Sequence, residues 1–374
     1  MKILQIASHL NVGGVSSHVV ALSQELARRG HQVVIASGGG QLDVRIDGTR
    51  LRHWPAPLHT SVEFSPQVLW ASGGLAQRLQ REPVDVVHGH TRVGQVVAAS
   101  LAQRLGVPYI TTWHGFFRSN LGRRLWPCLG QAAIAISDPV REHMIQALQV
   151  PEHLVRVILN GIDPAPFEVP VDPQTQRSFM QRLGIAPGTP LIGTMARLVA
   201  SKGLDVLIRS LPVIRAAIPD AKLLIIGDGP HRAALAQVAV EAGVSAAVTF
   251  AGSLPEAPVA LSLMDVFVFM PAEQEGFGLA LLEAMAAARP IVSVRRGGGA
   301  TWLLEHSGVG TIVPPDDPGA LAGAIIRTVQ DSAAAHRAAG QARALVSERY
   351  SLARMVDQVE DVYDSVAQPA AAAA

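Results

Sequence analysis

Short apolar segments alternate with amphipathic helical segments along most of the chain, and this alternation is the strongest constraint on its fold. Such alternation is typical of parallel sheets in α/β proteins, because a crossover between parallel strands usually contains a helix. The predicted strands are 3–8, 32–36, 85–89, 109–113, 133–137 and 155–159 in the first half, and 191–195, 222–227, 248–251, 266–270, 291–294 and 310–313 in the second. Two such series predict two doubly wound, Rossmann-like domains.

A cluster of prolines within residues 160–190 marks the predicted boundary between the two series. Prolines at this density interrupt regular structure. They are Pro164, Pro166, Pro170 and Pro173. We therefore predict an N-terminal domain over residues 1–165 and a C-terminal domain over residues 166–350. A final helix is expected over residues 351–367, and the alanine-rich residues 368–374 are expected to be disordered.

The composition of the 374 residues predicts a packed globular protein, with 49% apolar and 16% charged residues. A net charge of +1 argues against a general nucleic-acid-binding protein. The single cysteine, Cys128, cannot form an intrachain disulfide, which fits a reducing cytoplasm. The first predicted strand begins directly after Met1, so no signal peptide is expected, and no apolar run reaches the roughly 18 residues of a membrane span. These features favour a cytoplasmic location.

Charge is unevenly distributed between the two halves. Residues 1–165 contain 15 Lys and Arg against 10 Asp and Glu, whereas residues 166–374 contain 16 against 20. Within the basic half, the segment 116–126 interleaves Arg118, Arg123 and Arg124 with large apolar residues. One interpretation is docking on an anionic membrane or on a lipid-linked acceptor. The alternative is an ordinary helix that buries its apolar side.

Two glutamates that lie eight residues apart, Glu275 and Glu283, flank a predicted strand-to-helix junction. The strand 266–270 precedes them, and the helix 279–288 begins between them. The intervening Gly-Phe-Gly leaves the start of this helix open to an anionic ligand. Two carboxylates around such a helix start suggest a phosphorylated, hydroxyl-rich ligand such as a nucleotide sugar. Acidic residues that merely stabilise the helix are the alternative.

Two further junctions carry groups suited to phosphate. Arg197 and Lys202 follow the strand 191–195 and could clamp a diphosphate, or they could belong to a solvated basic loop. Gly13 and Gly14 follow the first strand, where they would allow a ligand to approach the backbone or would simply form a tight turn. The triple glycine at 297–299 leaves the same two alternatives, bare amides for a ligand or a flexible loop.

Three histidines stand where two neighbouring strands are predicted to end. They are His88, His90 and His114. Ligands of open α/β sheets bind outside the carboxyl ends of the strands, so all three could face a ligand. Three imidazoles could also ligate zinc. No carboxylate or cysteine accompanies them in sequence, and for His88 and His90 a packing role is favoured.

The combination of these motifs resembles the retaining glycosyltransferases of family 4, which have the GT-B fold. The motifs are Glu275-x7-Glu283 around Gly-Phe-Gly, Arg197-x4-Lys202, Gly13-Gly14, His114 and Asn160-Gly-Ile-Asp163. The resemblance covers nearly the whole chain. It implies two Rossmann-like domains that face a central cleft, and a C-terminal helix that crosses back to the N-terminal domain.

The resemblance implies that the C-terminal domain binds a nucleotide-diphosphate sugar and the N-terminal domain binds the acceptor. Arg197 and Lys202 would hold the diphosphate and stabilise the leaving group, and Gly13 and Gly14 would close over the same phosphates. No metal cofactor is expected, because two cations and a helix start can neutralise this charge and the sequence contains no Asp-x-Asp tripeptide.

The resemblance also assigns groups to the sugar and the nucleoside. Glu275 would hold sugar hydroxyls, Glu283 would hold ribose hydroxyls, and His114 would contact the donor sugar near the reacting carbon. Further donor contacts would come from Ser253, Leu254, Gly276, Phe277, Gly278 and Leu279. Together with Arg197 and Lys202, His114 and Glu275 form the expected catalytic set. The sequence departs from the family at residues 300–302, Ala-Thr-Trp, where many members carry Pro-Glu.

The expected activity is therefore transfer of a sugar to a hydroxyl of a sugar, a lipid-linked acceptor or a small molecule. A role in cell-surface glycan or glycolipid assembly at the inner face of the membrane is a hypothesis that follows from the basic segment 116–126. The alternatives are a nucleotide-sugar 2-epimerase and a non-catalytic protein that binds nucleotide sugars.

Overall fold

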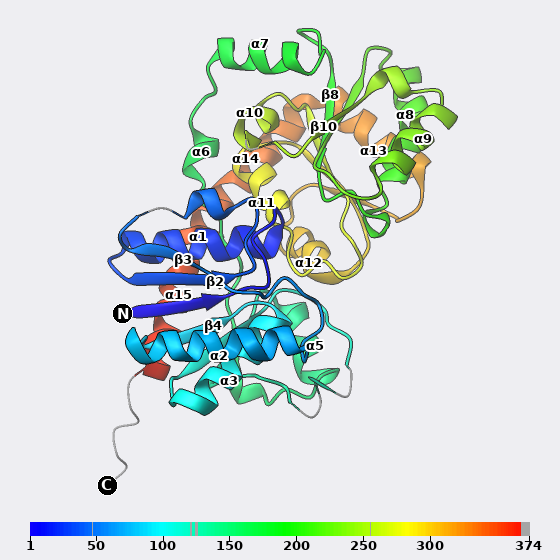
Figure 1. Ribbon diagram of the computed structural model, residues 1–374. Coiled ribbons are helices and arrows are strands. Elements are labelled where there is room, and N and C mark those ends of the chain that lie inside the picture. Colours follow the sequence, from blue (N-terminus) through cyan, green and yellow to red (C-terminus); the bar gives the residue numbers. More distant parts are fainter. Residues whose placement is uncertain (47, 120–121, 124–125, 255, 368–374) are drawn as a thin grey trace. The chain divides into compact units, whose positions relative to one another are not determined.

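The computed structural model describes residues 1–46, 48–119, 122–123, 126–254 and 256–367 (Figure 1). Arg124 of the basic segment and the alanine-rich residues 368–374 lie outside the described residues. The chain divides into two compact units. Unit 1 contains residues 1–161 and the C-terminal segment from Leu352, and unit 2 contains residues 162–351. The division after Gly161 falls inside the proline-rich region 160–190.

In unit 1, seven described strands form a parallel sheet in the order β3-β2-β1-β4-β5-β6-β7. The strands are β1 (Lys2–Ile6), β2 (Gln32–Ser37), β3 (Leu51–Pro55), β4 (Val86–Gly89), β5 (Tyr109–Trp113), β6 (Ala132–Ala135) and β7 (Val155–Val157). Successive apolar residues of one strand are buried on opposite faces, as Ile3 and Leu4 are in β1. A sheet buried on both faces explains why these strands read as continuous apolar runs.

Helices cover both faces of this sheet. They are α1 (Gly14–Arg28), α2 (Pro66–Arg81), α3 (Arg92–Leu105), α5 (Asp138–Gln146) and α15 (Leu352–Ala367). The buried residues of α1 and α15 share one core, and those of α2 and α3 share the other. α15 packs on α1 through Val359 and Tyr363, and Arg29 pairs with Asp357 and Glu360 at 2.6 and 2.5 Å. The helix from the end of the chain thus completes the N-terminal core.

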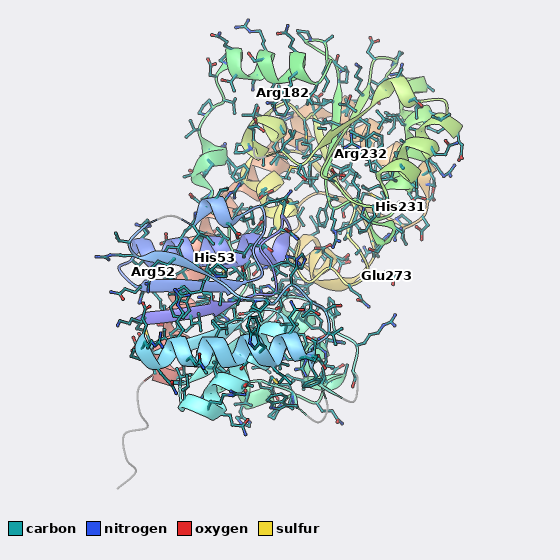
Figure 2. All side chains as sticks on the ribbon, in the orientation of Figure 1. Arg52, His53, Arg182, His231, Arg232 and Glu273 are labelled. Atoms are coloured by element: carbon teal, nitrogen blue, oxygen red, sulfur yellow. The ribbon has the colours of Figure 1, made fainter. Side chains whose placement is uncertain are left out.

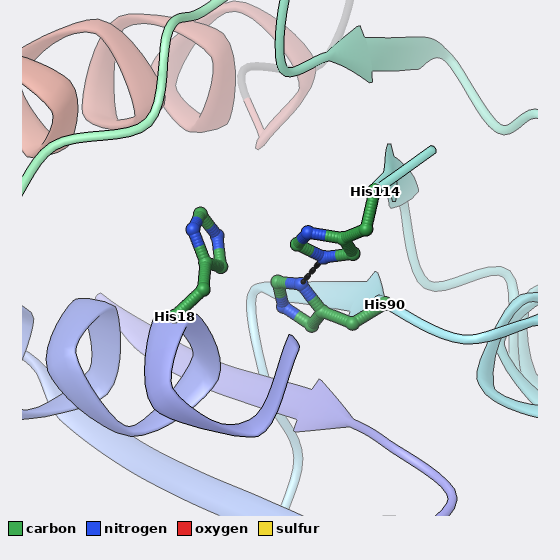
Figure 3. Close-up of side chains that lie close together, drawn as sticks. All are labelled: His18, His90 and His114. Carbon is green, nitrogen blue, oxygen red and sulfur yellow. Dashed lines mark hydrogen bonds between the residues drawn. The ribbon is translucent and has the colours of Figure 1, made fainter. Parts of the chain in front are cut away.

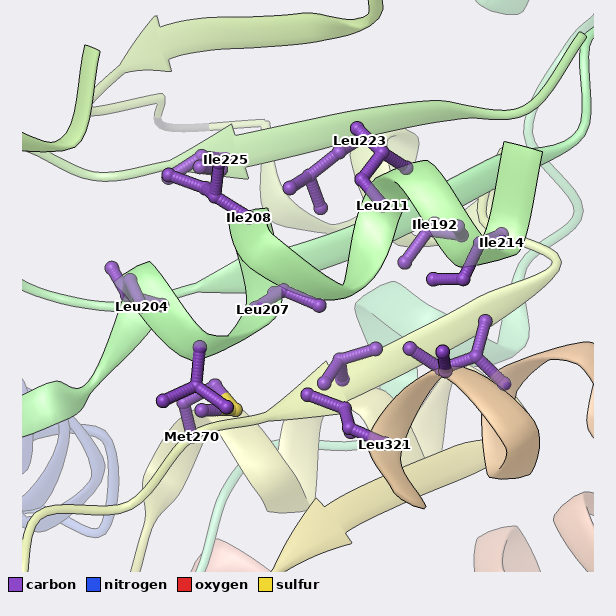
Figure 4. Close-up of a cluster of buried hydrophobic side chains, with 14 of the residues drawn as sticks. Ile192, Leu204, Leu207, Ile208, Leu211, Ile214, Leu223, Ile225, Met270 and Leu321 are labelled. Carbon is purple, nitrogen blue, oxygen red and sulfur yellow. The ribbon is translucent and has the colours of Figure 1, made fainter. Parts of the chain in front are cut away.

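In unit 2, six described strands form a parallel sheet in the order β10-β9-β8-β11-β12-β13. The strands are β8 (Leu191–Met195), β9 (Lys222–Ile226), β10 (Val248–Gly252), β11 (Val266–Phe269), β12 (Ile291–Val294) and β13 (Thr311–Val313). The helices are α6 (Ala165–Glu168), α7 (Pro173–Arg182), α8 (Leu204–Ala217), α9 (Arg232–Glu241), α10 (Ala257–Ser262), α11 (Leu279–Ala286), α12 (Gly298–Ser307), α13 (Pro318–Gln330) and α14 (Ser332–Arg349). Apolar residues of α8 and α13 pack on the strands in one core (Figure 4).

The prediction of two Rossmann-like domains with parallel sheets is confirmed, but two elements differ from the sequence analysis. β3 was not predicted, because this strand at the sheet edge carries the polar residues Arg52 and His53 and ends in Pro55 (Figure 2). A flexible loop was one of the two alternatives for the triple glycine, yet Gly298 begins α12. Ala300, Leu303 and Leu304 recur at helical spacing and are buried, so packing outweighs the low helix propensity of glycine.

Candidate active site

The donor-site residues predicted in unit 2 follow strands at the point where the strand order of the sheet reverses. From β8 the chain continues outward to β9 on one side, whereas β11 lies on the other side of β8. Ligands of open α/β sheets bind at this switch point, outside the carboxyl ends of the strands. The loop after β8 carries Arg197 and Lys202, and the loop after β11 carries Glu275. The fold therefore brings two segments that are distant in sequence to the same edge.

Lys202 and Glu275 form an ion pair at this edge. Their side chains are only 15% and 23% exposed, so water screens the pair less than it would screen a surface salt bridge. The Lys202 ammonium also lies 6.0 Å from the centre of the Phe269 ring. The backbone of Glu275 is fixed on both sides, because its N–H donates to Ala272 and its carbonyl accepts from Gly299 at 2.9 Å. Two residues with separate predicted roles are thus held in direct contact.

Gly278 provides the turn into α11, and glycine is required there. Its φ of +95° is unfavourable for other residues, and a Cβ at this position would lie 2.8 Å from Cζ of Phe269. The ring of Phe277 is buried against Tyr350, so Phe277 can offer a ligand only its backbone. Among the described residues no side chain caps α11 and its first turn has no acidic residue. The backbone amides at the start of α11 can therefore donate hydrogen bonds to an anion.

The other predicted donor-site side chains lie on the loops after β8 and β10 and on α11. Arg197 is exposed, and no ion pair or side-chain hydrogen bond connects it to another described residue. Ser253 is exposed and Leu254 is half-buried in the loop that follows β10. Glu283 is half-buried on α11, one turn beyond Leu279.

Arg296 is a cation beside Lys202 that the sequence analysis did not identify. A Cβ on Gly203 would lie 2.6 Å from Nη2 of Arg296, so the guanidinium packs directly on the backbone next to Lys202. Its side chain is 13% exposed and pairs with Asp316 at 2.5 Å. The signal available in the sequence was the Arg-Arg doublet that precedes the triple glycine.

Unit 1 has a second group of polar residues at the corresponding edge of its own sheet (Figure 3). His90 follows β4, His114 follows β5, and His18 lies on α1, which follows β1. Nδ1 of His90 and Nε2 of His114 are 3.2 Å apart, and each of the three residues places a ring nitrogen within 4.8 Å of the others. His18 was not predicted as a member. His88, which was predicted to lie with them, is within β4 and contacts Tyr363 and Thr112 instead.

Four neighbouring histidines of unit 1 have pKa values that favour the neutral imidazole. Burial lowers the pKa of His88, His90 and His114 well below the usual 6.5. Burial also lowers the pKa of His18 to about 4, although the nearby Asn160 side chain opposes this shift. Neutral imidazoles can accept hydrogen bonds as well as donate them, and they can also ligate metals. This edge therefore offers uncharged groups, whereas the edge in unit 2 is charged.

Gly13 and Gly14 are exposed at the start of α1 in unit 1. A Cβ on Gly13 would come no closer than 4.0 Å to another described atom, and one on Gly14 would meet nothing within 4 Å. Packing within the described residues therefore does not require glycine at either position. The helix start is uncapped by side chains, so its amides are open to a ligand.

The described part of the basic segment 116–126 is half-buried except at Arg118 and Ser119, which are exposed. The Arg123 guanidinium stacks 4.6 Å from the centre of the Phe117 ring, and Trp126 stacks on Phe64 at 5.9 Å. Phe64 is itself exposed, as are Val62, Leu69 and Trp70, which lie close to it in sequence. Within the part of the chain that the structure describes, no helix has the length and apolar character needed to cross a bilayer.

Comparisons with known proteins agree with this architecture. A family model for glycosyl transferases group 1 matches residues 189–331, and a model for glycosyltransferase family 4 matches residues 12–166. Similar proteins include an uncharacterized glycosyltransferase of Methanocaldococcus jannaschii, 27% identical with 94% of each chain covered. The N-acetyl-alpha-D-glucosaminyl L-malate synthase of Bacillus anthracis is 24% identical, with 96% of each chain covered.

Solved structures show the same fold. A glycosyltransferase from Rickettsia africae superposes with a TM-score of 0.86 at 20% identity, with 99% of each chain covered. The Anabaena protein HepE, in complex with UDP and glucose, superposes with a TM-score of 0.82 at 21% identity, with 98% of this chain and 100% of that one covered. The chain is therefore a glycosyltransferase with the GT-B fold. It belongs to glycosyltransferase family 4.

Proposed function

We propose that this glycosyltransferase moves a sugar from a nucleotide-diphosphate sugar to an acceptor hydroxyl, with retention of configuration and without a metal cofactor. The observation that carries the proposal is the Lys202–Glu275 pair at the switch point of unit 2, beside the open start of α11. A cation, a carboxylate and free amides match the phosphate and the hydroxyls of such a donor. The Anabaena relative in complex with UDP-glucose supports this class of donor.

The reaction breaks the bond between the anomeric carbon and the phosphate oxygen, and the electron pair leaves with the diphosphate. Lys202, Arg197 and the amides of Phe277, Gly278 and Leu279 would stabilise the negative charge that develops there. Arg296 lies close enough to Lys202 to add to this field. The acceptor oxygen then bonds to the anomeric carbon and loses its proton.

The remaining residues orient the donor. Glu275 would exchange its contact with Lys202 for one shared with the sugar hydroxyls, because the diphosphate competes for the ammonium. Glu283 would bind the ribose, and Ser253 and Leu254 would contact the nucleobase. In unit 1, Gly13 and Gly14 would approach the phosphates, and His114 would contact the donor sugar.

The acceptor is proposed to reach the enzyme at an anionic membrane on the cytoplasmic side. The support is a set of exposed apolar residues, Val62, Phe64, Leu69 and Trp70, of which Trp70 is 75% exposed, together with the exposed Arg118. Exposed aromatic residues beside arginine are typical of proteins that bind the bilayer interface. Co-sedimentation with anionic vesicles should fall in Trp70→Ser and stay unchanged in Val240→Ser, an equally apolar exposed site in unit 2. Equal binding of both variants would exclude this surface.

Two measurements test the activity. A panel of UDP-, GDP- and ADP-sugars should contain at least one that raises the melting temperature, since a ligand of the folded state at 100 times its Kd stabilises by about 2.7 kcal/mol. Product analysis without acceptor then separates transfer from the alternative of epimerisation. An epimerase would convert the nucleotide sugar to its epimer in that reaction, whereas the proposed enzyme would not.

A further inference from the structure

A continuous chain of hydrogen bonds runs from His114 into the core of unit 1. Nε2 of His114 contacts Nδ1 of His90 at 3.2 Å, and Nε2 of His90 contacts Oε1 of Gln5 at 2.6 Å. Nε2 of Gln5 contacts the Tyr363 hydroxyl at 2.9 Å, and that hydroxyl contacts Nδ1 of His88 at 2.7 Å. The chain ends at Thr112, whose hydroxyl lies 2.7 Å from Nε2 of His88. It links β1, β4, β5 and α15.

The chemistry of these groups gives the chain one direction. The amide nitrogen of Gln5 can only donate, so it donates to the Tyr363 hydroxyl. Burial raises the pKa of Tyr363, so its hydroxyl keeps its proton and can donate a hydrogen bond to Nδ1 of His88. Neutral His88 then carries its own proton on Nε2, which donates to Thr112.

The same amide fixes the two histidines on the other side. Oε1 of Gln5 can only accept, so His90 must carry its proton on Nε2. Nδ1 of the neutral His90 is then a bare lone pair, and it can accept only if His114 carries a proton on Nε2. Nδ1 of His114 is left without a proton, and no described residue donates a hydrogen bond to it.

We propose that Gln5, His90 and Tyr363 are positioning residues that hold His114 with its proton on Nε2, so that Nδ1 accepts a hydrogen bond from a substrate hydroxyl. This inference rests on the proposed function for the identity of the substrate. It also narrows the chemical class of the group that His114 would bind. The His114 edge carries no charge, so it selects an uncharged group that donates a hydrogen bond. His18 extends this edge, because both of its ring nitrogens are buried and neither makes a hydrogen bond of normal geometry with a described residue.

A metal ion held by His18, His90 and His114 is the competing explanation. Zinc bonded to three imidazoles at about 2.0–2.1 Å places their nitrogens roughly 3.4 Å apart. Here the three nitrogens lie within 4.8 Å of one another, and the 3.2 Å contact between His90 and His114 is already explained by a proton. The two explanations differ at one atom, because a metal would displace the proton from Nε2 of His114.

The position of this proton can be measured directly on the full chain. Long-range ¹⁵N–¹H NMR of the histidine-labelled protein distinguishes a protonated from an unprotonated ring nitrogen, and His114→Gln identifies the resonances. The expected result is a protonated Nε2 and a bare Nδ1 on His114. The opposite tautomer would overturn the proposal, because it would mean that the chain runs in reverse. Loss of the Nε2 proton on addition of one equivalent of zinc would also overturn it.

Tyr363→Phe tests whether the chain controls the tautomer. Without the hydroxyl, the Gln5 amide can rotate, and His114 should populate both tautomers with a fall in kcat/KM of about tenfold, the value of one hydrogen bond. Tyr109→Phe removes a hydroxyl elsewhere in unit 1 and should change neither. A single unchanged tautomer in Tyr363→Phe, or a shifted tautomer with an unchanged rate, would contradict the proposal. If the wild-type tautomer is as expected but no nucleotide sugar reacts, the proposed function has failed, whereas the inference about the series of hydrogen bonds holds.

Discussion

The two units share a sheet topology and differ sharply in what they place at its switch point. In unit 2, a largely buried ion pair and a nearby guanidinium surround the start of a helix. In unit 1, three histidines with lowered pKa values, His18, His90 and His114, occupy the equivalent edge, and their contacts are made through uncharged groups. The difference teaches that the fold supplies a position and the side chains supply the chemistry. A charged edge suits a diphosphate leaving group, and a neutral edge suits hydroxyls.

Replacing Lys202 should have the largest effect. Lys202→Ala removes the cation that we propose to face the departing diphosphate, and loss of one such stabilising group lowers kcat by about 10²–10³. The measurement is the initial rate of sugar transfer at a saturating donor concentration. Lys222→Ala is a matched control. Lys222 lies at the amino end of β9, whereas Lys202 follows the carboxyl end of β8, and the Lys222 ammonium contacts the carbonyl of Gly184. Equal rates in the two variants would remove the basis for a charged donor site.

The neutral edge of unit 1 should make stability depend on pH. His18 has a lowered pKa, so the unfolded chain binds a proton from about pH 6.5 downward, and the folded chain does so only near pH 4. The contribution of His18 alone should therefore lower the free energy of unfolding by about 3 kcal/mol as the pH decreases from 6.5 to 4.

His18→Gln isolates this contribution from those of the facing His90 and His114. Chemical denaturation at several pH values should show a shallower loss of stability toward acid in the variant than in the wild type. The same slope in both proteins would mean that His18 is not held neutral by the fold.

Glu283→Gln should weaken nucleotide binding without unfolding the protein. A hydrogen bond to a charged group contributes roughly 1.5–3 kcal/mol, which corresponds to a loss of affinity of about ten- to hundredfold. Calorimetric titration of the nucleoside diphosphate measures this loss. Because the ribose contact is assigned to unit 2 alone, an unchanged affinity would move the nucleoside to another site.

The smallest effect is expected for substitutions in α15. This helix comes from the end of the chain, and the histidine edge of unit 1 depends on it. Val359 is buried between α15 and α1, and Val359→Ala should lower the free energy of unfolding by about 1–3 kcal/mol. Asp361→Ala, on the exposed side of α15, should change it by less than about 0.5 kcal/mol. Urea unfolding compares the two, and equal effects would contradict the packing of α15 on the core.

The sequence predicted the architecture well because both sheets are buried on both faces, so their strands are continuous apolar runs. It also predicted Lys202 and Glu275 as donor-site residues, because both stand in local motifs, but it did not predict the ion pair between them. It missed the hydrogen-bonded chain of unit 1, because no local pattern links Gln5 to Tyr363, which lie 358 residues apart. His18 and Arg296 were missed for a related reason, since each is significant only through neighbours from other elements.

The central claim is that the charged edge of unit 2 is the donor site. Calorimetric titration of UDP, GDP and ADP into the wild type and into Lys202→Met tests it most directly. The account predicts that at least one nucleoside diphosphate binds the wild type with one site per chain, and that the variant binds it at least about tenfold more weakly. Equal affinity in the two proteins, or binding of none of the three, would contradict it.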